Sequence, residues 1–157
     1  MTSPTEFDLP TPFAWRHEVV QDEIDEYNHV NNVCYVQWFD TTAWEHSAAL
    51  GLPVARCVEL DRGMAVVRSV IGYLRPALLG DQVEVATWLL PGNRRLRVAR
   101  RFQVRRAGDL ATLARAEIEY ACIELTSGRP MRWPAEFHAS YRPLAPVIEA
   151  YATLPPL

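Results

Sequence analysis

Lysine is missing from this sequence: all sixteen basic residues are arginine, which we interpret as the codon bias of a GC-rich genome. No apolar run approaches the roughly 20 residues that cross a bilayer, so we expect no membrane association. The N-terminus has no basic patch followed by an apolar stretch, and we therefore expect no secretory signal. The formal net charge of −3 argues against nucleic acid as a partner, because nucleic-acid binding usually requires a basic surface.

Several chemical motifs are also missing. The three cysteines are widely spaced and form no CxxC pair, which favours free thiols in a cytoplasmic protein over a zinc ribbon or a redox motif. The four histidines show no HExxH pattern or paired metal spacing, so we expect no metal site. The absence of GxSxG, GxGxxG and P-loop patterns argues against an α/β-hydrolase nucleophile elbow and the common nucleotide-binding loops.

The 157 residues are enough for one domain with a real core. Residues 1–12 contain three prolines and predict a flexible tail, and residues 141–157, with four prolines, predict a second tail that drapes over the surface. Weak alternation over residues 15–20 indicates a strand. Apolar residues at spacings of three, four and seven predict a helix over residues 33–50, and this helix has little purely polar face.

After the predicted helix the pattern changes to that of β-strands separated by turn residues. Four such strands are predicted, over residues 64–74, 83–90, 96–106 and 110–125. In the third of these, apolar residues alternate with arginines, which predicts one buried face and one solvated basic face. Arg100 stands on the apolar face and needs a partner, which we expect at a dimer interface or in an active site. The short connections favour an α+β fold in which one long helix is wrapped by a curved antiparallel sheet.

One polar segment, residues 22–32, directly precedes the predicted helix and combines carboxylates, an imidazole and three amides. Helix capping explains part of this pattern, because asparagine is a good N-cap residue and acidic groups are favourable near a helix N-terminus. Capping does not explain why Asp25 and His29, four positions apart, both lie just before an apolar helix.

The order Asp25-x-x-x-His29-Val30-Asn31-Asn32-x-x-Tyr35 resembles the signature of hotdog-fold thioesterases of the 4-hydroxybenzoyl-CoA type, and it is also similar to a segment of plant acyl-ACP thioesterases. A second resemblance lies in residues 73–83, which match the "Y..P...GD.V" pattern of the same family. A weaker third match is the Ser-Gly-Arg-Pro run at residues 127–130. The resemblance implies a hotdog thioesterase domain over residues 13–140.

The chain also departs from the family pattern at two positions. Asn28 stands where many members have glycine, and asparagine tolerates a positive φ better than most residues, so the turn can survive. Tyr27 stands where the plant enzymes have asparagine, so no role of that asparagine transfers to this chain.

The resemblance implies roles for five residues near the helix start. Asp25 is the implied catalytic carboxylate, acting either as a general base on water or as a nucleophile. The Asn32 backbone N–H, with Asn31 beside it, is the implied oxyanion donor at the helix N-terminus. His29 either orients the substrate or protonates the thiolate, or it is a turn residue bonded to backbone. Tyr35 either lines the acyl pocket or belongs to the core.

The remaining expectations concern the substrate and assembly. Arg94 and Arg95 follow a turn and are candidates to bind the phosphates of coenzyme A, the alternative being solvated side chains. We expect an acyl-CoA or acyl-ACP thioester as the small-molecule substrate and no cofactor apart from its coenzyme A. The alternatives are a non-catalytic acyl-CoA-binding hotdog domain and a hotdog dehydratase. Open sheet edges predict self-association as a dimer or tetramer, with active sites between subunits by resemblance.

Overall fold

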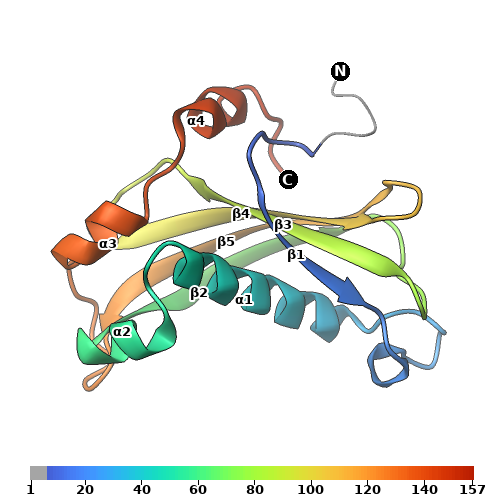
Figure 1. Ribbon diagram of the computed structural model, residues 1–157, viewed down its shortest axis with the longest axis horizontal. Coiled ribbons are helices and arrows are strands. Elements are labelled where there is room, and N and C mark those ends of the chain that lie inside the picture. The colour runs from blue at the N-terminus through green and yellow to red at the C-terminus, as the bar shows by residue number, and fades with distance from the viewer. Residues whose placement is uncertain (1–6) are drawn as a thin grey trace.

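The computed structural model describes residues 7–157, which form a five-stranded antiparallel sheet that curves around one long helix (Figure 1). The elements in chain order are β1 (Phe13–Glu18), η1 (Gln21–Glu23), α1 (Asn32–Ala49), α2 (Val54–Glu59), β2 (Arg62–Tyr73), β3 (Gln82–Leu90), β4 (Arg97–Arg106), β5 (Thr112–Glu124), α3 (Ala135–Ser140) and α4 (Ala145–Tyr151). The predicted α+β architecture is confirmed, with the long helix displaced by one residue and each strand by one or two residues at most ends.

The strand order is β1-β3-β4-β5-β2, so β1 and β2 form the two edges of the sheet. The register pairs Phe13 with Thr87 and Glu18 with Gln82, which places the end of β1 beside the start of β3. At the other edge the twelve-residue strand β2 pairs with β5 on one side only. This long edge strand carries exposed valines near its middle, where the pairing with β5 is interrupted between Val66 and Arg68.

The main core lies between α1 and the concave face of the sheet. Trp38 and Phe39 are buried there, and the ring of Phe39 lies 5.0 Å from that of Phe102 on β4. The helix buries the stripe that contains Tyr35 and Trp38, whereas Val33 is 62% and Val36 is 46% exposed. Further along the helix Phe39 and Ala43 are also buried, so the apolar residues left exposed on this side lie near the start of the helix.

The opposite, convex face of the sheet is also covered, which corrects the prediction of a solvated basic face. Arg101 and Arg105 on β4 are buried, and they pair with Glu117 at 2.9 Å and Glu84 at 2.8 Å respectively. The cover consists of residues 7–12 and α4. Its apolar contacts form a second cluster of Leu9, Ala86, Trp88, Leu90 and Val147.

Over residues 7–12 the N-terminal segment therefore differs from the expected flexible tail, whereas the C-terminal segment packs over the sheet. Residues 1–6 of the predicted N-terminal tail lie outside the described residues. Asp8 and Leu9 pack across the sheet, and the carboxylate of Asp8 pairs with Arg115 at 2.6 Å. The proline-rich C-terminal segment contains α4, whose Val147 is buried. Within residues 7–157, no helix has the length and apolarity that a membrane span requires.

Candidate active site

The loop between β1 and α1, residues 19–31, holds the segment that resembles the thioesterase signature. Both ends of this loop are hydrogen-bonded to the connection between β2 and β3. The Val19 N–H donates to the Asp81 carbonyl at 2.9 Å, and the Val30 N–H donates to the Ala77 carbonyl at 3.0 Å. The loop is therefore held at its two ends, although most of its residues are exposed.

Residues 25–29 form a tight turn closed by hydrogen bonds between its first and last residues. The Asp25 N–H donates to the His29 carbonyl at 2.8 Å. Oδ1 of Asp25 accepts from the backbone N–H groups of Tyr27 at 2.9 Å and His29 at 3.4 Å. Asn28 has a φ of 59°, so the prediction that asparagine supports a left-handed turn at this position is confirmed.

Two polar groups of this turn have no protein partner within residues 7–157. Oδ2 of Asp25 makes no hydrogen bond there, and neither does the imidazole of His29. Asp25 is half-buried and His29 is exposed. Both groups are accessible to a ligand that approaches the turn.

The N-terminus of α1 follows directly. Asn31 is the N-cap, and its Oδ1 accepts from the Val33 N–H at 3.0 Å, as expected for an asparagine in this position. The Cys34 N–H donates to the Asn31 carbonyl at 2.9 Å. The Asn32 N–H is left without a hydrogen bond among the described residues, so it is a free donor at the positive end of the helix dipole.

Glu23 organises this region, and sequence reasoning missed its role. Its carboxylate accepts from the Trp38 indole N–H and the Val20 N–H, each at 2.9 Å, and lies 2.8 Å from Nε2 of His17. Burial alone raises the pKa of Glu23, but these hydrogen bonds together hold it below its usual value. The Glu23 carbonyl also accepts from the Asn31 N–H at 2.8 Å, so this residue positions the helix cap.

The second resembling segment packs against the first. The Tyr35 hydroxyl accepts from the Ala77 N–H at 3.0 Å, and the Tyr73 hydroxyl donates to the Asn32 carbonyl at 3.3 Å. Tyr35 is 2% exposed, and burial raises its pKa. These contacts give Tyr35 a structural partner, and its predicted contact with substrate stays a prediction.

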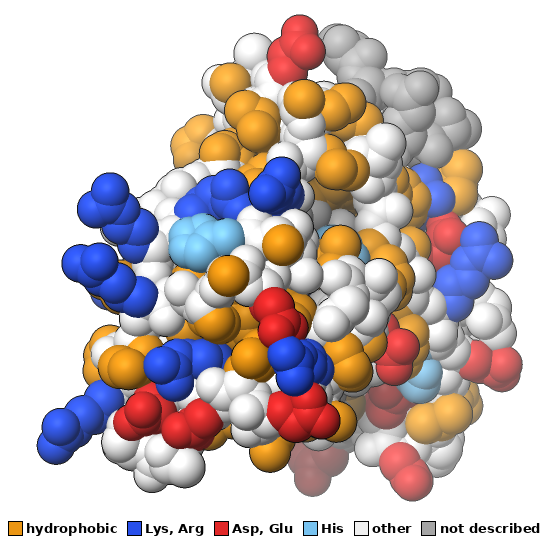
Figure 2. All heavy atoms as spheres, turned by 60° about the vertical axis from the view of Figure 1, so that its left-hand side comes forward, with side chains coloured by type: hydrophobic (Ala, Val, Ile, Leu, Met, Phe, Trp, Pro, Cys, Tyr) orange, Lys and Arg blue, Asp and Glu red, His pale blue; other side chains and the backbone are white. Residues whose placement is uncertain are grey.

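Arg94 and Arg95 lie at the opposite end of the sheet from the Asp25 loop. They follow the end of β3, whereas the Asp25 loop lies beside its start, and nine strand residues span about 27 Å. Arg94 donates to the His138 carbonyl at 2.7 Å in the α3 region, and Arg95 is exposed. Figure 2 brings this end forward and shows arginine side chains gathered on it. Within one chain the structure does not bring these two arginines to Asp25.

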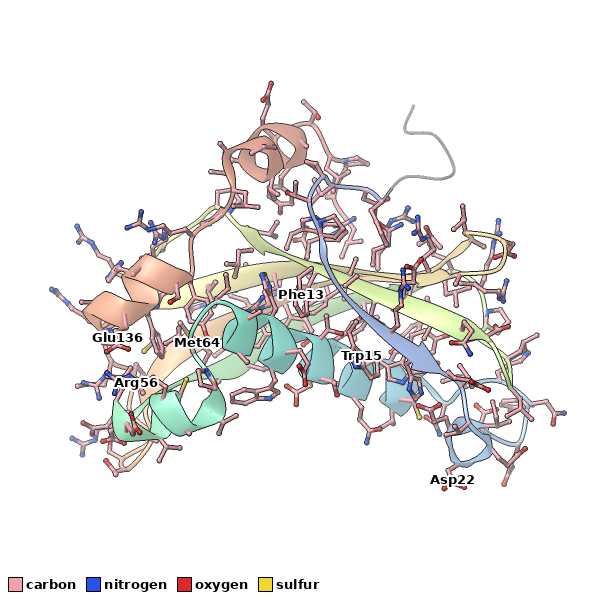
Figure 3. The ribbon with its side chains drawn as sticks, in the orientation of Figure 1. Phe13, Trp15, Asp22, Arg56, Met64 and Glu136 are labelled. Carbon is pink, nitrogen blue, oxygen red and sulfur yellow. The ribbon has the colours of Figure 1, made fainter. Side chains whose placement is uncertain are left out.

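Figure 3 shows the same separation through its labels. Asp22 lies in the loop before α1, whereas Arg56 and Glu136 form an ion pair between α2 and α3 at the opposite end. The third resembling segment, residues 127–130, also lies at the α2 end, because its neighbour Thr126 bonds to Asp61 before β2.

Arg100 is buried on the concave face, as its sequence position indicated, but its partners come from its own chain. Its guanidinium lies 2.7 Å from Nδ1 of His46 and donates to Oγ of Ser47 at 3.0 Å. Arg100 therefore has two partners within its own chain, and the expected partner at a dimer interface or in an active site stays a prediction.

Neither a nucleophilic cysteine nor a metal site is supported by the described residues of this region. Cys34 is buried, and burial together with the nearby Glu23 raises its pKa, which keeps the thiol protonated. The described part of the chain contains no group of three or more His, Cys, Asp or Glu residues that could hold a metal ion.

Residues 19–140 match the model of the thioesterase-like superfamily, and this match covers most of the chain. The chain belongs to the thioesterase-like superfamily. Family membership confirms the prediction of a thioester hydrolase. No curated protein matches the chain.

Solved structures agree on the fold. The protein is similar to Slr0204, a 1,4-dihydroxy-2-naphthoyl-CoA thioesterase from Synechocystis, with 18% identity, a TM-score of 0.75, and coverage of 83% of this chain and 96% of that one. It is similar to SAV2348 from Staphylococcus aureus, solved with CoA, with 17% identity, a TM-score of 0.77, and coverage of 95% and 97%. The hypothetical protein TT1821 from Thermus thermophilus has 25% identity, a TM-score of 0.73, and coverage of 81% and 95%. The hotdog fold expected from the sequence is confirmed.

Proposed function

We propose that this protein hydrolyses an acyl-coenzyme A thioester at the junction of the Asp25 turn and the α1 N-terminus. The observation that carries the proposal is the free backbone N–H of Asn32, three residues after a turn that leaves one carboxylate oxygen of Asp25 unbonded. A free donor and a free carboxylate on one short segment are the two parts that thioester hydrolysis needs.

The Asn32 N–H serves as the oxyanion donor. The thioester oxygen gains negative charge in the transition state, and a donor already oriented by the helix stabilises that charge without reorganisation. The helix dipole acts in the same direction. Removing one such donor typically costs about 3 kcal/mol in the barrier, so this single N–H is a substantial part of the expected catalysis.

Asp25 supplies the attacking group. As a general base, it takes a proton from the water that attacks the carbonyl carbon. As a nucleophile, it attacks that carbon itself, the thiolate leaves, and water then hydrolyses the resulting anhydride. Single turnover in ¹⁸O-labelled water, followed by mass spectrometry of the protein, separates the two, because only the anhydride route can place label in the Asp25 carboxylate.

His29 is the group that orients the substrate or protonates the departing thiolate. Its backbone is committed to the turn with Asp25, but its imidazole is free and exposed. A neutral or charged imidazole beside the carboxylate can therefore reach a ligand without breaking a protein contact.

We also propose that two chains pair through β2 and α1. The outer edge of β2 is unpaired among the described residues, and the neighbouring surface carries exposed Val33, Val36 and Val67. An unpaired edge and an adjacent apolar surface are covered together by a two-fold axis that pairs the β2 strands antiparallel. That axis also reverses the partner's α1, so the α1 N-terminus of one chain faces the C-terminal half of α1 in the other.

The test is thiol release from a panel of acyl-CoA substrates, comparing Asp25→Asn with its matched control Asp22→Asn. Asp22 is an exposed neighbouring carboxylate in η1 (Figure 3). We expect Asp25→Asn to lower kcat by about 10²–10⁴-fold and Asp22→Asn to leave it near wild type. Binding of acyl-CoA by the wild-type protein without release of thiol would contradict the proposal and would support the non-catalytic alternative.

A further inference from the structure

A hollow that is partly open to solvent lies between the C-terminal half of α1 and strands β2, β4 and β5. Apolar side chains such as Ala43, Met64 and Val98 form much of its lining, and Met64 is labelled in Figure 3. Arg100 and Tyr120 also line it. A mostly apolar hollow with a few convergent polar groups is typical of a small-molecule site.

Arg100 is an unusual component of such a lining because it carries a buried charge. Its side chain is 2% exposed, and its guanidinium carbon lies 5.8 Å from the centre of the Tyr141 ring. Its hydrogen-bond partners are His46 and Ser47. Burial and the neighbouring Arg100 lower the pKa of His46 to about 4, so the imidazole is neutral and accepts the hydrogen bond.

All of these partners are neutral. Within residues 7–157, no carboxylate oxygen lies within 4.0 Å of a nitrogen of Arg100. The arginines buried on the convex face differ, since Arg101 pairs with Glu117 and Arg105 with Glu84. A buried charge without an opposite charge is costly, so Arg100 favours the binding of an anion in the hollow.

Tyr120 offers a second donor to the same anion. It is 6% exposed, and its hydroxyl makes no hydrogen bond in the described part of the chain. Burial raises its pKa to about 12, partly offset by Arg100, so the hydroxyl keeps its proton at neutral pH. Asp40 is the acidic residue of the lining, but it is exposed, and water screens its charge more than that of Arg100.

We infer that the hollow takes the acyl group of the substrate and that Arg100, assisted by Tyr120, binds a carboxylate at the far end of that group. The substrate class is then the coenzyme A monothioester of a dicarboxylic acid. The hydrolytic step rests on the proposed function, whereas the binding of a carboxylate by Arg100 is measurable without turnover.

The binding test uses free dicarboxylates from succinate to sebacate, each compared with the uncharged diamide of equal carbon number. At the best chain length we expect the wild-type protein to bind the dicarboxylate about tenfold more tightly, since hydrogen bonds to charged groups are worth this much. Arg100→Met should remove the preference, and Tyr120→Phe should reduce it several-fold. Arg97→Met is the matched control, because Arg97 is an exposed arginine of the same strand paired with Glu119.

A wild-type protein that binds the dicarboxylate and its diamide equally, or a preference that survives in folded Arg100→Met, overturns the inference. If Arg100→Met does not fold, as judged by circular dichroism, Tyr120→Phe decides the matter, because its hydroxyl has no protein partner to lose. An unchanged preference in Tyr120→Phe then overturns the inference.

The kinetic test compares adipyl-CoA with hexanoyl-CoA and their shorter and longer homologues. We expect kcat/KM to favour the dicarboxylic monothioesters in wild type and the difference to disappear in Arg100→Met. Equal turnover of both series overturns the substrate class and leaves the proposed hydrolysis standing. Absence of turnover with every acyl-CoA, together with Arg100-dependent binding of dicarboxylates, contradicts the proposed hydrolysis and supports the anion site.

Discussion

Replacing Glu23 by glutamine tests whether one ionised side chain holds the active-site loop. The carboxylate accepts from Trp38 through Oε1 and from the Val20 N–H through Oε2, and His17 lies within 2.9 Å of both oxygens. An amide has only one accepting oxygen, so whichever way it points, one of these N–H donors faces the amide NH₂. Hydrogen bonds to charged groups contribute about 1.5–3 kcal/mol each.

The side chain of Glu23 is 15% exposed, so solvent weakens these contacts little. We therefore expect Glu23→Gln to lower the free energy of unfolding by about 2–3 kcal/mol, which corresponds to a fall in Tm of roughly 4–10 °C for a domain of this size. The control is Asp22→Asn, since Asp22 is exposed and makes no side-chain hydrogen bond among the described residues.

The effect should depend on pH in a defined direction. Because the folded protein holds the pKa of Glu23 below its usual value of 4.5, the stability that its ionisation adds is present above pH 4.5 and is lost as pH falls through the lower, folded-state pKa. Thermal denaturation by circular dichroism should thus show a gap between wild type and Glu23→Gln that is full at pH 7 and narrows below pH 4.5. Equal Tm values at pH 7, or a gap that does not narrow in acid, would refute this reasoning.

Three further predictions concern the turn, the cap and the assembly. His29→Ala should lower kcat/KM about tenfold, less than Asp25→Asn, and a wild-type rate of thiol release would assign His29 to the turn alone. Asn31→Ala removes the acceptor for the Val33 N–H and should cost about 1 kcal/mol, measured as a fall in Tm of about 2–4 °C, whereas an unchanged Tm would show that the cap is dispensable. Val36→Glu should give a monomer in light scattering and lose activity, while Val58→Glu on α2, where the valine is also exposed, should remain associated; a Val36→Glu protein that stays associated would exclude this face as the interface.

Local features of the fold were predictable because neighbouring residues determine them. The start of α1, the capping role of Asn31 and the positive φ of Asn28 all follow from the chemistry of a few adjacent residues. The strands followed from alternation and turn residues in the same way. The contact between the Asp25 loop and residues 77–81 was not readable from spacing, and only the resemblance indicated that both segments belong together.

The features that could not be predicted depend on residues distant in sequence. In the sequence Glu23 resembles any other acidic loop residue. Its role depends on the hydrogen bond from Trp38, which is fifteen positions further along the chain. Arg101 reads as solvated because the pattern of β4 does not reveal that the chain termini cover its face. Arg100 was recognised as needing a partner, but the choice of His46, fifty-four positions away, depends on how α1 crosses the sheet.

The cover over the convex face has a consequence for the order of folding. Asp8 pairs with Arg115, 107 positions later, and Leu9 shares its cluster with Val147 on α4. On a ribosome, which releases the chain from its N-terminus, these first residues have no place to dock until β5 and then α4 have emerged. Contacts of such long separation also close slowly once the chain is free, because each requires a large loop to form. Until then residues 7–12 and α4 do not cover the indole of Trp88. The nascent sheet therefore exposes an apolar patch that chaperones can bind.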